Sequence, residues 1–104
     1  SMIHLTSGNF FQEAERSELP VLIDFYAAWC GPCKALAATF ESLAEQYGAR
    51  VKFCKVDVDA EPQLAGKFGI MSVPTLVLLK NGRVSQQLSG VRTAAELTGT
   101  FALS

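Results

Sequence analysis

The sequence predicts an α/β fold in which a central mixed β-sheet is flanked by helices on both faces. Segment 21–27 is apolar at both odd and even positions, which is typical of a strand covered on both faces. Strand-like and helix-like segments alternate over the first two-thirds of the chain, and a hairpin signal follows them. With 104 residues, 49% of them hydrophobic, and no linker-like stretch, we expect one domain spanning residues 1–104.

In the first half of the chain we expect a short strand at 3–5 and a short helix at 9–17. The helix has three capping candidates, which are Thr6, Ser7 and Asn9. After strand 21–27, one face of a longer helix is marked by apolar residues at spacings of four, three and four: Leu36, Phe40, Leu43 and Tyr47. Pro32 suits the first turn of this helix, and Gly48 suits its end.

In the second half we expect a strand at 51–58, a short helix at 61–68, and two strands at 74–80 and 83–89. The dipeptide Asn81-Gly82 between the last two strands predicts a tight hairpin, since such a turn needs positive φ at both positions. A capping-box pattern then opens a terminal helix with the residues Thr93, Ala94, Ala95 and Glu96.

The charge pattern argues against two classes of partner. Nine basic and ten acidic residues give a net charge of −1, so no broad positive surface is available for nucleic acid. No apolar run approaches the roughly 18 residues of a membrane-spanning helix. The start of the chain lacks a basic segment followed by an apolar one, and Ser1 before Met2 resembles a cloning remnant, so we expect a cytoplasmic protein without a secretory signal.

Cys30 and Cys33 stand two residues apart at the junction of a strand and a helix, and four interpretations compete. As a structural staple the pair closes a very short loop, which contributes only about 2 kcal/mol. As zinc ligands the pair is incomplete, because only Cys54 and His4 remain and both are distant in sequence. Two inert helical thiols would not require the flanking Trp, Gly and Pro.

The redox interpretation uses all of these features. Positions i and i+3 on a first helical turn lie about 5 to 6 Å apart between Cα atoms, which suits a disulfide that opens and closes. The unpaired N–H groups of the helix start stabilise a thiolate, which is the nucleophile in disulfide exchange. We therefore expect Cys30, nearer the surface, to attack a substrate, and Cys33, one turn inside, to resolve the intermediate.

The segment Trp29-Cys30-Gly31-Pro32-Cys33-Lys34, preceded by Asp24-Phe25, resembles the active site of the thioredoxin family. The resemblance covers nearly the whole chain, and its other matching positions are Val73-Pro74-Thr75, Lys80-Asn81-Gly82 and Gly90. It implies the thioredoxin fold and a protein-disulfide reductase with no bound cofactor and no metal. It also implies a monomer that acts on disulfide-containing proteins and is recycled by a thioredoxin reductase. The Gly-Pro dipeptide is similar to that of the reducing members.

Asp24 stands alone in an apolar strand, where a carboxylate must lose its charge, find a partner or face water from an edge. The resemblance implies that it lies buried beneath Cys33, with a raised pKa, as the general acid/base that acts on that thiol through water. Lys55, on the neighbouring predicted strand, resembles the family lysine near this carboxylate. An ordinary solvated strand lysine is the alternative for Lys55.

The resemblance also implies a substrate-binding rim. Pro74 is expected to follow a cis bond and to face the cysteines, leaving the Val73 backbone free to pair with a substrate segment. Trp29 would shield the thiols, although it could also be a core aromatic. The other expected rim residues are Gly31, Pro32, Gly90 and Val91. By contrast, Cys54 sits among apolar strand residues and reads as a buried, inert thiol.

Two positions depart from the common family pattern, Ala38 in place of a helix proline and Tyr26 in place of a tryptophan, and we expect neither to touch the thiol chemistry. Two other functions stay open, because a fold does not determine an activity. One is a thiol oxidase or isomerase on the same fold, and the other is a redox-independent binding subunit.

Overall fold

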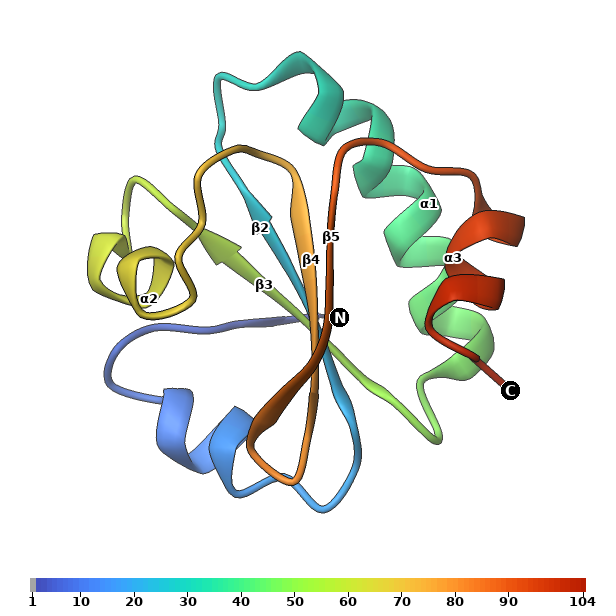
Figure 1. Ribbon diagram of the computed structural model, residues 1–104, viewed down its shortest axis with the longest axis horizontal. Helices are drawn as coiled ribbons and strands as arrows, with labels where there is room; N and C mark the ends of the chain where they lie inside the picture. Colours follow the sequence, from blue (N-terminus) through green and yellow to red (C-terminus); the bar gives the residue numbers. More distant parts are fainter. Residues whose placement is uncertain (1) are drawn as a thin grey trace.

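A computed structural model describes residues 2–104, which form one five-stranded mixed sheet with helices on both faces (Figure 1). Ser1, expected to be a cloning remnant, lies outside the described residues. The elements, in chain order, are β1 (Ile3–His4), η1 (Phe11–Glu15), β2 (Val21–Tyr26), α1 (Gly31–Tyr47), β3 (Lys52–Asp57), α2 (Pro62–Lys67), β4 (Thr75–Lys80), β5 (Arg83–Ser89) and α3 (Ala94–Thr100).

The strand order in the sheet is β1-β3-β2-β4-β5, with β2 at the centre. β2 pairs in parallel with β3 and antiparallel with β4, while β1 runs parallel to β3 and β5 antiparallel to β4. The predicted mixed sheet is therefore confirmed. Both faces of β2 are covered, which explains why its sequence is apolar at both parities.

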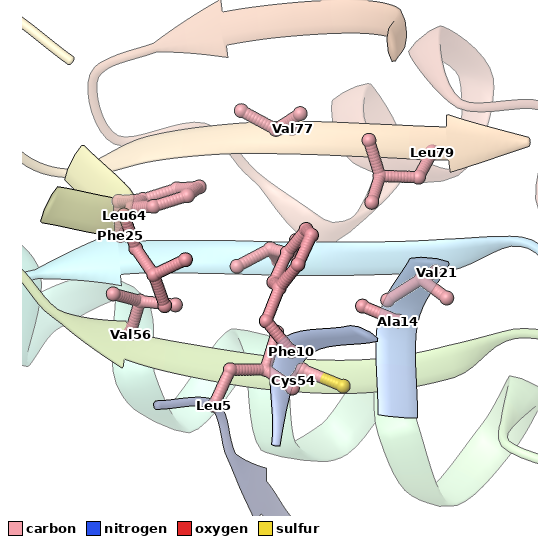
Figure 2. Close-up of a cluster of buried hydrophobic side chains, with 11 residues drawn as sticks. Leu5, Phe10, Ala14, Val21, Phe25, Cys54, Val56, Leu64, Val77 and Leu79 are labelled. Atoms are coloured by element: carbon pink, nitrogen blue, oxygen red, sulfur yellow. The ribbon is translucent and has the colours of Figure 1, made fainter. Parts of the chain in front are cut away.

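Side chains alternate along β2 between two buried clusters. Val21, Ile23 and Phe25 belong to the cluster on the face covered by η1 and α2. Figure 2 shows Val21 and Phe25 there among Phe10, Ala14 and Leu64. Leu22 points to the other face, where the cluster also contains residues of α1 and α3. Figure 1 shows α1 and α3 together on that side. This alternation fixes where the next even-numbered residue, Asp24, must point.

The first predicted helix differs most from the structure. Segment 9–17 is not an α-helix over its whole length but contains a five-residue π-helix, η1, with Phe10 as its N-cap. The Arg16 amide donates to the Phe11 carbonyl five residues back, which is the pattern that defines a π-helix. Of the three capping candidates, Thr6 and Asn9 hydrogen-bond each other through backbone N–H groups and side-chain oxygens, which closes the turn before η1.

The remaining elements match the predicted ones apart from one or two residues at their ends. β4 begins at Thr75 rather than 74, because Pro74 has no N–H to offer the ladder. Asn81 and Gly82 have φ values of 53° and 76°, which confirms the predicted hairpin turn. Thr93 and Glu96 form both hydrogen bonds of the capping box, which confirms the predicted start of α3.

Candidate redox site

Four chain segments meet at one end of the sheet, at the top of Figure 1. β2 and β3 are parallel, so the loops that follow them emerge at the same end, and β4 runs the other way, so it begins there. β5 runs antiparallel to β4 and therefore ends there as well. This topology brings the Cys30 loop, the loop after Asp57, the Val73-Pro74 bond and Gly90 to the same end.

Cys30 and Cys33 are joined by a disulfide, with their Cα atoms 5.2 Å apart. Cys30 is the N-cap of α1 and has an extended backbone, and the proline of the motif occupies the first turn, where a missing N–H costs nothing. The Cys33 amide donates a hydrogen bond to Cys30 Sγ at 3.1 Å. The Cys30 sulfur therefore occupies the place of a capping oxygen, where the helix start stabilises negative charge.

Residue exposure does not separate the two cysteines as expected. Cys30 and Cys33 are each only 4% exposed, so the prediction that Cys30 lies nearer the surface is wrong. Ala27, Tyr26, Val58 and Val73 pack around the pair and cover both residues. What distinguishes Cys30 is position, because its sulfur caps the helix and lies 3.8 Å from the Val73 carbonyl oxygen.

The Val73–Pro74 peptide bond is cis, as the resemblance implies. The Gly90 amide donates to the Pro74 carbonyl at 2.9 Å, which ties the end of β5 to this loop. Within residues 2–104, neither the amide nor the carbonyl of Val73 has a backbone partner. The Val73 backbone thus offers an unused donor and acceptor beside the Cys30 sulfur.

Trp29 is 72% exposed, which excludes the core alternative. Its indole Nε1 donates to Asp59 Oδ2 at 2.7 Å, so the exposed ring is fixed in place by the loop after β3. Sequence reasoning missed Asp59. A signal was present, since polar residues just after a parallel strand collect at the same end of the sheet as the loop after its neighbour.

An apolar groove of about 200 Å³ lies beside Trp29. Its lining residues are Trp29, Val58, Ile70, Met71, Ser72 and Val73. Two of these were expected at the rim, while Met71, which is 95% exposed, was missed because nothing in its sequence context marks it as a surface residue. Gly31, Pro32, Gly90 and Val91 do not line the groove. A larger cavity of about 440 Å³ lies at the opposite end of α1, away from the sulfurs.

Asp24 is completely buried, and within the described residues neither of its carboxyl oxygens has a hydrogen-bond partner. Its position in β2 places it on the face of Leu22, the face covered by α1, whose buried stripe begins with Cys33. Burial raises the pKa of Asp24 from 3.8 to about 6, and the nearby Lys55 charge opposes this rise. The alternative of a water-facing edge carboxylate is therefore excluded.

Lys55 pairs with Asp24 in the parallel register of β2 and β3, so the two side chains lie on the same face. The Lys55 ammonium lies 4.5 Å from the centre of the Tyr26 ring. Cys54, the next residue back, points to the other face and is a free, buried thiol. Burial raises the pKa of Cys54 to about 11, consistent with the predicted inert thiol.

The sequence matches the model of the thioredoxin family over residues 1–102. The chain belongs to the thioredoxin family. It is similar to a thioredoxin of Bacillus subtilis, with 48% identity over 92 residues, covering 88% of this chain and 86% of the relative. It is also similar to a thioredoxin of Alicyclobacillus acidocaldarius, with 45% identity over 98 residues, covering 94% of this chain and 92% of the relative.

Family membership and the disulfide geometry together identify a protein-disulfide oxidoreductase of the thioredoxin type that acts by thiol–disulfide exchange through Cys30 and Cys33. The thioredoxin family works through its own cysteine pair, without a bound cofactor. Residues 2–104 contain no group of three or more His, Cys, Asp or Glu side chains placed to hold a metal ion. In the same residues, no helix is both long and apolar enough to cross a membrane.

Proposed function

We propose that this thioredoxin-family protein works in the reducing direction, as a dithiol carrier that reduces disulfides in other proteins. The observation that carries the proposal is the position of the Cys30 sulfur. This sulfur accepts a hydrogen bond from the Cys33 amide and lies beside the Val73 backbone, whose amide and carbonyl have no backbone partner in the described residues. The nucleophilic sulfur therefore lies next to backbone groups that can pair with an extended segment of a substrate. The Gly31-Pro32 dipeptide, similar to that of reducing members, supports this direction.

In the first step, the Cys30 thiolate attacks one sulfur of a substrate disulfide. A bond forms between Cys30 and that sulfur, the substrate S–S bond breaks, and the second substrate sulfur leaves as a thiolate. The Cys33 amide and the start of α1 stabilise the Cys30 thiolate before the attack. The Val73 amide and carbonyl hold the extended substrate segment in register with the attacking sulfur.

In the second step, the Cys33 thiol gives its proton through water to the Asp24 carboxylate, and the resulting thiolate attacks Cys30 Sγ. The Cys30–Cys33 disulfide forms, the bond between Cys30 and the substrate sulfur breaks, and that sulfur leaves as a thiolate. Both substrate sulfurs are then reduced, and two electrons have passed from the carrier to the substrate. A carboxyl with a pKa of about 6 is suited to this exchange near neutral pH. Lys55 limits how far burial raises that pKa.

The substrate surface is the apolar groove together with its rim. Trp29 and Val73 line the groove directly, and the cis peptide bond to Pro74 follows Val73. Gly31, Pro32, Gly90 and Val91 lie outside the groove and are proposed to complete the rim. Substrates with an apolar residue next to the disulfide cysteine would fit this surface.

A Cys30–Cys33 disulfide must be reduced again after each cycle, and a thioredoxin reductase is the proposed partner for this step. The chain would act as a single-domain monomer spanning residues 1–104, in the cytoplasm, where carriers of this kind keep protein thiols reduced. Nucleic acid and membranes are not proposed partners, in agreement with the balanced charge of the sequence.

Reduction of insulin in the presence of NADPH and a thioredoxin reductase tests the proposal. We expect turnover that requires both cysteines, and a Cys30→Ser variant is the matched inactive control. A reduction potential more oxidising than that of glutathione would instead favour a thiol oxidase or isomerase. Full biological activity of a Cys30→Ser, Cys33→Ser double variant would favour a binding subunit.

A further inference from the structure

The aromatic ring of Tyr26 contacts the Lys55 ammonium, whose charge lowers the pKa of the buried Asp24 carboxyl. Lys55 Nζ lies 4.5 Å from the Tyr26 ring centre, within the range of a cation–π contact. Tyr26 follows Asp24 by two residues in β2, so both side chains lie on the same face of the sheet, and Lys55 is the register partner of Asp24. The ring, the ammonium and the carboxyl therefore form one cluster.

The charged and titratable groups around this cluster come from three elements. β3 contributes Lys55 and also Asp57, which is the register partner of Tyr26. The inner stripe of α1 contributes Cys33, which does not titrate while it is in the disulfide. Burial, Asp57 and Asp24 all raise the pKa of the Tyr26 hydroxyl, so the ring stays neutral wherever Asp24 titrates.

The Lys55 charge lowers the pKa of Asp24 from a distance, since no salt bridge joins the two side chains within residues 2–104. Asp24 is completely buried, whereas Lys55 is half-buried, and carrying the ammonium down to the carboxyl would strip it of water. The ring of the half-buried Tyr26, 4.5 Å from the ammonium, offers an intermediate position. There the ammonium keeps part of its hydration and stays close enough to act on the carboxyl through its charge.

We propose that Tyr26 is a positioning residue for the exchange reaction, because its ring holds the Lys55 ammonium where its charge supports the Asp24 carboxylate. The proposal rests on the proposed role of Asp24 as proton acceptor for Cys33. Without the ring, the Lys55 side chain extends into water and its charge stabilises the Asp24 carboxylate less. The proton affinity of Asp24 then increases, and the pH range in which Asp24 can accept a proton moves upward.

The test is an NMR titration of the Asp24 carboxyl carbon in the oxidised protein, where the cysteines cannot titrate. Tyr26→Phe keeps the ring and should keep the wild-type pKa of Asp24. Tyr26→Leu should raise that pKa by roughly half a unit, in keeping with an exposed cation–π contact. In a Lys55→Gln background the Phe and Leu variants should give the same pKa, because the ring acts through the lysine.

The proposal is overturned if Tyr26→Leu leaves the Asp24 pKa unchanged or lowers it, or if the difference between Leu and Phe persists without Lys55. Tyr26→Met provides a second ring-free variant should the leucine variant fail to fold. In turnover, the pH profile of mixed-disulfide resolution should move by the same half unit, so that the rate near pH 6 falls about two-fold. A failure of the proposed Asp24 role is distinguishable, because it would show as an unchanged resolution rate in Asp24→Asn whatever the titration gives.

Discussion

The indole nitrogen of Trp29 donates a hydrogen bond to Asp59 Oδ2 at 2.7 Å, joining two residues that are 30 positions apart in the chain. Trp29 is mostly exposed, so no core packing holds its ring in place. The charged acceptor on the loop after β3 does so instead. The wall of the apolar groove, proposed above as the substrate surface, thus depends on a surface carboxylate.

Asp59→Leu should lower kcat/KM for a protein disulfide about five-fold, because losing a hydrogen bond worth about 1 kcal/mol frees the Trp29 ring. Asp59→Asn keeps an oxygen acceptor and should lose less. A small aromatic disulfide, which does not need the groove, serves as the control substrate in the same assay. An equal loss on both substrates would mean that Asp59 acts on the cysteines and not on the groove.

Asp24→Asn should slow the resolution of the mixed disulfide at neutral pH, since an amide cannot accept the Cys33 proton. We expect a ten-fold to hundred-fold loss, at or below the lower end of the range of general acid/base catalysis, because hydroxide and water still deprotonate the thiol. Rapid-quench trapping of the mixed disulfide measures this step directly. Loss of the fold, monitored by circular dichroism, would be inconsistent with the expected result, as would an unchanged rate.

The same carboxyl should make stability depend on pH. The folded pKa of Asp24 is raised from 3.8 to about 6, so the folded state binds this proton more tightly than the unfolded state. Stability therefore falls as pH rises between these two values, by about 3 kcal/mol in total, and the deficit persists above pH 6. Below pH 3.8 both states are protonated and the deficit vanishes.

Urea unfolding of wild type and Asp24→Asn at several pH values checks this dependence. The Asn variant lacks this titration, so its stability relative to wild type should be about 2.5 kcal/mol higher at pH 8 than at pH 4, where part of the deficit is already present. Other acidic groups titrate equally in both proteins and cancel from the difference. A difference that does not change with pH would show that Asp24 is not a buried carboxyl with a raised pKa.

Gly82→Ala should destabilise the fold by about 1 to 3 kcal/mol. Gly82 has φ +76°, and an added Cβ would lie 2.9 Å from the Glu15 carbonyl oxygen of η1. Gly99 is the matched control, because it lies inside α3 and, among the described residues, no atom comes within 4 Å of an added Cβ. Gly99→Ala should stabilise by about 0.5 to 1 kcal/mol, and a loss as large as that at Gly82 would contradict this account.

Local signals were sufficient for much of the fold and for the redox pair. Asn81-Gly82 and the Thr93 capping box each specify their structure within a few residues, and the Cys30-Cys33 spacing does the same for the disulfide. The π-helix was not foreseen, because a 3.6-residue period and a π-bulge share the same apolar positions over so short a segment.

The features that sequence reasoning missed depend on contacts across the fold. Asp59 and Met71 reach the site only because two loops converge at the same end of the sheet. The equal burial of Cys30 and Cys33 has the same origin, since Tyr26, Val58 and Val73 come from three different segments. The position of the Cys30 sulfur at the helix start, by contrast, follows from local sequence and could be anticipated.

The redox bond joins two neighbours within one helical turn, with Cα atoms 5.2 Å apart, and fastens no distant parts of the chain to each other. Forming or breaking this disulfide therefore does not require the strands and helices to move relative to one another. A partner that distinguishes the reduced protein from the oxidised one therefore has to recognise the few atoms around the two sulfurs. It cannot rely on a conformational change elsewhere.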